Sequence, residues 1–146
     1  ARLWHWLAFV FQPKLMVAWC FALAATQLPD WSRVCWTLAG LAGADLVGIF
    51  IKHTLRRSRP AGHLDHDDGY SYPSGHVLSA SVLALMICQL FGGGPWLTAG
   101  LLVWWTLMVG SRLVLRAHYP SDALAATLLA VAWLALQNLV WLMLGW

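Results

Sequence analysis

The charged residues of this chain are kept out of its long apolar runs. Residues 34–51, 77–91, 96–110 and 123–146 contain one charged side chain between them, Asp45. With 60% hydrophobic and 10% charged residues, the chain is more apolar than a water-soluble domain, in which apolar residues make up about half. Backbone polar groups in lipid must be hydrogen-bonded within a helix or a closed barrel, and these runs lack strand alternation. We therefore expect an all-α integral membrane helical bundle.

The apolar runs give about five recognisable transmembrane segments. Residues 3–28 form the first, and the four runs above form the others. The break at residues 12–14 (QPK) makes the first segment either one kinked helix or a short interfacial helix followed by a span. Residues 92–95 (GGGP) predict a tight turn between two spans. The chain begins with Ala1 and shows no signal-peptide pattern, and we expect a single membrane domain over residues 1–146, truncated at its amino terminus.

Two polar stretches interrupt the apolar runs. Residues 52–76 (KHTLRRSRPAGHLDHDDGYSYPSGH) hold four of the nine Lys and Arg residues between Lys52 and Arg59. Residues 111–122 (SRLVLRAHYPSD) add two Arg, a His and an Asp. Because two predicted crossings separate the stretches, both should return to the same membrane face. We expect them to meet in a cationic pocket with two imidazoles, which suits a phosphate.

Each polar stretch ends where a helix is predicted to begin. Ser74 and Ser121 are the expected N-caps, and the free amides of a first helical turn attract an anion. Asp122 follows His118 by four residues, close enough to hold one ring nitrogen and leave the other to attack. A phosphoryl-transfer site of this kind needs positioning, charge neutralisation, a nucleophile and a proton donor.

Three motifs in order carry a resemblance to a known family. Lys52 is followed after six residues by Arg59-Pro60, residues 73–76 read Pro-Ser-Gly-His, and Ser111-Arg112 precedes the pair His118 and Asp122. This pattern resembles the signature of the type 2 phosphatidic acid phosphatase superfamily, which includes membrane lipid phosphatases and soluble vanadium haloperoxidases. The resemblance covers residues 45–123.

The resemblance implies a role for each signature residue. His118 would be the nucleophile that becomes phosphorylated, Asp122 would orient it, and His76 would protonate the leaving group. The residues implied to hold the phosphate are Lys52, Arg59, Ser74, Gly75 and Arg112, with Ser111 as a further candidate. The family implies no cofactor and no metal requirement.

The implied activity is that of a membrane lipid phosphatase that removes the terminal phosphate of a lipid phosphate or pyrophosphate through a phosphohistidine. Candidate substrates are undecaprenyl pyrophosphate, phosphatidylglycerol phosphate and phosphatidic acid. The alternatives are a phosphotransferase that passes the phosphate to another lipid, and a non-enzymatic membrane protein that binds or transports phospholipid. The apolar composition argues against a soluble haloperoxidase.

The resemblance also bears on topology. The membrane branch of the family usually has six spans, which favours a missing or shortened first span here. Its bacterial members mostly work on the outer face of the inner membrane, so we expect the active site to face the periplasm or the cell exterior. The positive-inside rule alone points to the cytoplasm, but the phosphate site itself requires these cations.

Several other residues have both a structural and a functional interpretation. Asp45 lies inside a span, where a carboxylate is costly and by default a functional candidate, although we favour a role in bracing its helix. Gly40, Gly43 and Ala44 offer the small-residue surface on which membrane helices pack closely. The side chains of His63 and residues 65–68 resemble a metal-ligand set, but we favour a solvated acidic loop.

The remaining charged and sulfur-bearing residues have plainer interpretations. We expect the arginines outside the signature to contact lipid headgroups; these are Arg56, Arg57 and Arg116. The net charge of +3 does not indicate nucleic-acid binding, because the basic residues cluster at predicted membrane boundaries. We expect the cysteines to be small core residues; these are Cys20, Cys35 and Cys88.

Overall fold

The computed structural model describes residues 2–63 and 69–146, and these residues form helices and loops with no strand. The prediction of an all-α fold is confirmed. The helices are α1 (Arg2–Val10), α2 (Pro13–Ala25), α3 (Trp31–Leu55), α4 (Gly75–Phe91), α5 (Pro95–Val114) and α6 (Pro120–Met143).

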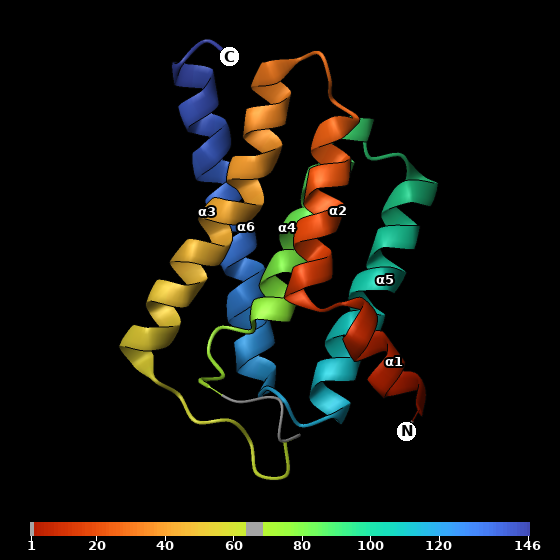
Figure 1. The fold of residues 1–146 in the computed structure, drawn as a ribbon, viewed down its shortest axis with the longest axis vertical. Coiled ribbons are helices and arrows are strands. Elements are labelled where there is room, and N and C mark those ends of the chain that lie inside the picture. The colour runs from red at the N-terminus through yellow and green to blue at the C-terminus, as the bar shows by residue number, and fades with distance from the viewer. Residues whose placement is uncertain (1, 64–68) are drawn as a thin grey trace.

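Helix α4 is the centre of the bundle. It packs against α2, α3, α5 and α6, whereas α1 packs against α5. Helices α3 and α5 run in one direction along the bundle, and α4 and α6 run in the other (Figure 1). The loop that follows α3 and the loop that precedes α6 therefore lie at one end, and the α4–α5 turn lies at the opposite end (Figure 1).

The helices of the described residues differ in whether their length and apolar composition allow them to cross a membrane. Helices α3, α5 and α6 are each long and apolar enough, and α1 with α2 would make a fourth span bent by 47°. The break between α1 and α2 falls where residues 12–14 predicted it. Helix α4 has 17 residues, which rise about 26 Å and so fall short of a hydrocarbon core of about 30 Å. The structure thus supports an integral membrane protein but not the count of about five spans.

The helix ends near the polar loops confirm one predicted cap and correct another. Ser74 caps α4, because its side chain accepts a hydrogen bond from the Val77 amide at 3.3 Å. The N-cap of α6 is Tyr119 and not Ser121, since Pro120 already occupies the first helical position. The Asp122 carboxylate accepts from the Tyr119 amide at 2.8 Å. At the opposite end, Gly92 ends α4 with a φ of 86°, so the predicted glycine turn is confirmed.

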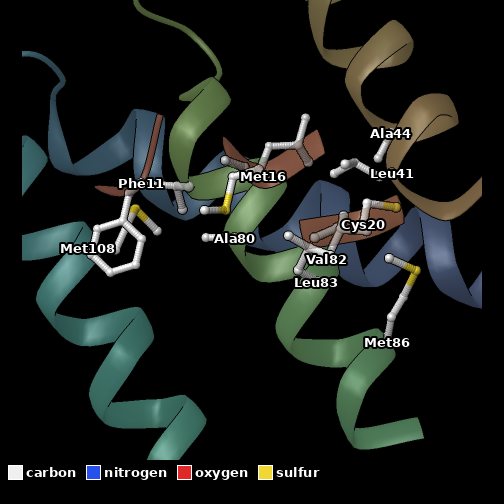
Figure 2. Packing of buried hydrophobic residues seen from close by; sticks show 14 of the residues in the cluster. Phe11, Met16, Cys20, Leu41, Ala44, Ala80, Val82, Leu83, Met86 and Met108 are labelled. Atoms are coloured by element: carbon white, nitrogen blue, oxygen red, sulfur yellow. The ribbon is translucent and has the colours of Figure 1, made fainter. Parts of the chain in front are cut away.

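The core is an apolar cluster to which all six helices and their connections contribute. Figure 2 shows Phe11, Met16, Leu41 and Met108 packed around α4, which contributes Leu83 to the cluster. Among the cysteines, Cys20 is buried, Cys88 is half-buried and Cys35 is exposed. The prediction that all three are core residues is therefore wrong for Cys35, which lies on the outer side of α3.

The small residues of α3 admit two large side chains. A Cβ atom at Gly43 would overlap the Trp133 ring of α6, and one at Gly40 would overlap the Met86 sulfur of α4. Ala44 is fully buried in the same surface. The prediction of close helix packing on this surface is confirmed.

Candidate active site

The two polar stretches meet at His118, which lies in the loop between α5 and α6 and is 3% exposed. Its Nδ1 is 2.8 Å from the carbonyl oxygen of Ser71, in the first stretch. Its Nε2 is 3.3 Å from Nη1 of Arg59, which also donates to the Ala117 carbonyl at 2.8 Å. The prediction that the stretches meet is confirmed.

These two contacts define the protonation of the imidazole. A carbonyl oxygen only accepts hydrogen bonds, so Nδ1 of His118 carries the ring proton toward Ser71. A guanidinium group only donates, so Nε2 presents its lone pair to Arg59. His118 therefore has the tautomer that a nucleophile attacking through Nε2 requires.

The surroundings also keep His118 neutral. Burial lowers the pKa of its imidazole from the ordinary value of about 6.5, and the positive charges of Arg59 and Arg112 lower it further. The Asp122 carboxylate and the Ser71 carbonyl act in the opposite direction without reversing the shift. The unprotonated form of His118 is thus favoured at neutral pH.

Asp122 is fully buried in the first turn of α6. Its Oδ1 is 3.1 Å from Nη1 of Arg57, and its Oδ2 accepts from the Tyr119 amide. The distance from Oδ2 to Nδ1 of His118 is 3.6 Å, which is longer than a hydrogen bond. The sequence indicated that Asp122 would hold the imidazole, but the Ser71 carbonyl makes the shorter contact, and Asp122 lies behind it as a buried negative charge.

Arg57 was expected to contact lipid headgroups, yet its side chain turns inward. Its Nη1 donates to Ser121 Oγ at 2.6 Å as well as to Asp122, and its guanidinium lies 4.3 Å from the centre of the Tyr119 ring. The Arg57 carbonyl accepts from the Ser71 amide at 2.8 Å. Arg57 therefore positions both groups that lie behind the His118 ring.

The start of α4 lies beside the start of α6. The Ser74 amide donates to the Asp122 carbonyl at 3.3 Å, so the first turns of both helices open at the same end of the bundle. A Cβ atom at Gly75 would lie 3.7 Å from Nζ of Lys52, which places that ammonium group at the same helix start. His76 is the second residue of α4 and is half-buried.

Arg112 brings a third cation to this end of the bundle. It is 2% exposed in the last turn of α5, and its carbonyl accepts from the Ala117 amide at 3.0 Å. The hydroxyl of Ser111 donates to the Met108 carbonyl at 2.7 Å, so this side chain is bonded within α5. The structure thus gathers Lys52, Arg59 and Arg112 around the two helix starts and the loop that holds His118.

The loop that was interpreted as solvated and acidic, rather than as a metal site, lies mostly outside the described residues. His63 is described, and its Nδ1 is 3.0 Å from the Pro60 carbonyl. In residues 2–63 and 69–146, no three His, Cys, Asp or Glu side chains are arranged to hold a metal ion. Residues 65–68 are not among those described.

Comparison with known proteins agrees with the signature. Residues 33–146 match the PAP2 superfamily. A 75-residue segment is 44% identical to phosphatidylglycerophosphatase B of Haemophilus influenzae, covering 47% of this chain and 31% of the relative. The Escherichia coli K12 protein of the same name is 39% identical over 82 residues, covering 55% of this chain and 32% of the relative.

A second group of relatives covers more of the chain. Decaprenylphosphoryl-5-phosphoribose phosphatase of Mycobacterium tuberculosis H37Rv is 33% identical over 121 residues, covering 75% of this chain and 65% of the relative. No solved structure gives a significant match. The chain belongs to the PAP2 superfamily, and it spans about a third of the length of the phosphatidylglycerophosphatase B relatives.

Proposed function

We propose that this protein is a membrane lipid phosphatase that works through a phosphohistidine at His118. The observation that supports the proposal is the orientation of the His118 ring, which its two nitrogen contacts fix. Its Nδ1 donates to the Ser71 carbonyl, and its Nε2 lone pair faces Arg59. The relatives support the class of substrate, because their names describe phosphatases of lipid-linked phosphates.

In the first step, Nε2 of His118 attacks phosphorus and the bond from phosphorus to the leaving-group oxygen breaks. His76 gives a proton to that oxygen. The proton stays on Nδ1, which donates to the Ser71 carbonyl, and the buried charge of Asp122 stabilises the positive phosphohistidine.

In the second step, a water molecule attacks phosphorus and His76 takes its proton. The bond from phosphorus to Nε2 breaks, inorganic phosphate leaves, and His118 returns to its neutral form. Throughout, the oxygens of the transferred group would be held by positive charges and by the start of α4. The groups proposed for this role are Lys52, Arg59, Arg112, Ser74 and Gly75.

We propose that these cations replace a metal ion and that no cofactor takes part. Phosphoryl transfer requires mainly positioning and charge neutralisation from the protein. One guanidinium group can bind two oxygens of a phosphate at the same time. The substrates proposed are undecaprenyl pyrophosphate, phosphatidylglycerol phosphate and phosphatidic acid. The proposed location is the bacterial inner membrane, with the site facing the periplasm or exterior. Labels near Gly69 and Ser121 should then react from that side, and a label near Gly93 from the cytoplasm.

The test is phosphate release by the purified protein in detergent, with and without excess EDTA. We expect inorganic phosphate from at least one of the three lipids, at the same rate in chelator, and inhibition by vanadate. A phosphorylated lipid acceptor in place of inorganic phosphate would show a phosphotransferase. Binding without turnover on any of the lipids would reject the enzymatic proposal, and loss of turnover in EDTA with rescue by a divalent ion would reject metal independence alone.

A further inference from the structure

A cavity of about 190 Å³ lies next to the proposed phosphate site, where α2, α3 and α4 come together. Lys52 and Gly75, two of the proposed phosphate-binding residues, line it. Two further polar residues, Asp45 and Ser79, also line it. The cavity therefore runs from the place where a phosphate would sit to a carboxylate inside the bundle.

Asp45 and Ser79 form the polar part of this cavity. Ser79 Oγ donates to Asp45 Oδ1 at 3.0 Å. Ser79 follows Gly75 by one helical turn, which is about 6 Å along α4. A carboxylate has about four acceptor positions, so the bond from Ser79 leaves Asp45 able to accept from a further hydroxyl. The separation of Gly75 and Ser79 along α4 matches a hydroxyl group one or two carbon atoms beyond the phosphate ester.

The rest of the lining is apolar or small. It includes Pro13, Gly48, Pro73 and Leu78. The volume is below the roughly 300–1,000 Å³ of sites that enclose a whole small molecule. The cavity therefore suits a compact fragment with carbon on most sides and a hydroxyl donor at one point, as in a glycerol or a pentose.

We propose that Asp45 and Ser79 form a hydroxyl-binding subsite that selects lipids whose terminal phosphate is carried by a polyol. The proposal rests on the function proposed above. A free hydroxyl next to the phosphate ester donates a hydrogen bond to Asp45, while the phosphate lies against Lys52 and the start of α4. Lipids with no free hydroxyl near the phosphate leave the carboxylate without this donor.

Two other uses of Asp45 fit the structure less well. A brace between α3 and α4 accounts for the bond to Ser79, but it does not account for an adjoining cavity that reaches the phosphate site. A hydrocarbon tail in the cavity would lie against a carboxylate, which is unfavourable because the charge loses solvation without gaining a donor. A substrate hydroxyl that enters the cavity and donates to Asp45 accounts for both the carboxylate and the cavity beside it.

The experiment compares three lipids with the same acyl chains: phosphatidylglycerol phosphate, its analogue lacking the free hydroxyl of the terminal glycerol, and phosphatidic acid. For the wild type, we expect kcat/KM to be roughly tenfold or more higher on the hydroxyl-bearing lipid, because sites built to bind a hydroxyl discriminate strongly against its absence. Asp45→Leu should lower kcat/KM about ten- to a hundredfold on that lipid and less than about twofold on the other two.

Three further variants keep the test decisive if Asp45→Leu fails to fold. Asp45→Asn and Ser79→Ala should give smaller losses with the same dependence on the hydroxyl. Asp30→Asn is the matched control, because it removes the carboxylate that caps α3 outside the cavity and keeps a good N-cap residue. It should change no substrate ratio, and elution profile and thermal unfolding report the folding of each variant.

Each outcome bears on one proposal. Equal losses on all three lipids would give Asp45 a purely structural role, and no loss on any would show that the cavity does not contact the substrate. A wild-type enzyme without preference for the hydroxyl would overturn the subsite while leaving the phosphatase proposal intact. Failure of the wild type to release phosphate from any lipid would overturn the phosphatase proposal itself.

Discussion

The two ends of the bundle both gather polar side chains, but the hydrogen-bond partners of these side chains differ. At the end remote from His118, Trp36 Nε1 donates to Asn138 Oδ1 at 2.9 Å. The side-chain amides of Gln89 and Asn138 bond to each other in both directions, at 3.0 and 3.1 Å. These groups are neutral, and each has a partner within the protein.

Among the residues that the structure describes, the end that holds His118 has more cationic than anionic side chains. Arg57 pairs with the buried Asp122, whereas Lys52, Arg59 and Arg112 gather around two helix starts. Positive charges held close together and away from water are unfavourable unless an anion joins them. The side chains of Trp36, Gln89 and Asn138 thus find partners within the protein, whereas under the proposed function the phosphate of a substrate would join the cations at the His118 end.

His118→Ala should have the largest effect on turnover. We expect turnover to fall roughly ten-thousandfold or more on every substrate, because the variant has lost the atom that attacks phosphorus. Phosphate release and acid-quenched trapping of phosphoenzyme measure the effect. Phosphoenzyme that persists in His118→Ala would reject the nucleophile assignment.

His76→Ala should have a large effect that depends on the leaving group. General acid catalysis is worth roughly a hundredfold to ten-thousandfold, so phosphatidic acid, which releases an alkoxide, should lose that much. An aryl phosphate or a lipid pyrophosphate releases a stable anion and should lose less. The rates on the three substrates are the measurement, and equal losses would remove His76 from the role of acid.

Arg57→Met tests whether the bonds from Arg57 to Asp122 and Ser121, next to the His118 imidazole, affect catalysis. Without the guanidinium, Asp122 and Ser121 lose a hydrogen-bond donor, whereas the Arg57 backbone still accepts from the Ser71 amide. The carboxylate behind the imidazole is then less well positioned, and kcat should fall roughly ten- to a hundredfold with KM little changed. Arg56→Met is the matched control, because the exposed Arg56 side chain bonds to the nearby His53 carbonyl. Similar losses in both variants would show that Arg57 acts only through the charge of the surface.

The pH dependence of kcat/KM tests the effect of the neighbouring charges on His118. Because burial and the two arginines lower the pKa of His118, the acid limb of kcat/KM should lie below the ordinary imidazole value of about 6.5. Arg112→Gln removes one positive neighbour, so the pKa should rise and the acid limb should move to higher pH. Profiles of both proteins on one substrate cancel the ionisation of the substrate. If the acid limb of Arg112→Gln stays at the same pH or moves to lower pH, the charge of Arg112 does not lower the pKa of His118.

At the remote end we expect the smallest effect. Asn138→Leu removes the partner of both Gln89 and Trp36, which should lower the free energy of unfolding by about 0.6 kcal/mol, with about 1.7 kcal/mol as an upper bound. Phosphatase rates should stay the same. Thermal unfolding in detergent measures the difference, with Thr127→Val of the same helix as a control that loses only a local bond. A rate loss would show that the two ends are coupled.

The fold was predictable where nearby residues in the sequence determine the structure. Apolar runs bounded by charges defined α3 to α6 to within a few residues, and the cap at Ser74 follows from residue type alone. The cap at Tyr119 was missed because Ser121 is the better capping residue by type. The proline at position 120 was the signal for an earlier start.

The site was predictable where a motif names side chains. The contact between His118 and the Ser71 carbonyl was not, since every residue has a carbonyl and the sequence does not show which one faces a ring. The pair Arg57–Asp122 was missed because 65 residues separate its members. A buried carboxylate needs a cation, but the sequence offers several.

The close fit between Gly43 and the Trp133 ring limits the size of the side chains at both positions. Any side chain at position 43 would occupy the space of the indole, so a larger residue there is tolerated only where position 133 holds a smaller one. The two positions should therefore change together among relatives that keep this helix pair, and a Trp at position 133 should be accompanied by glycine at position 43.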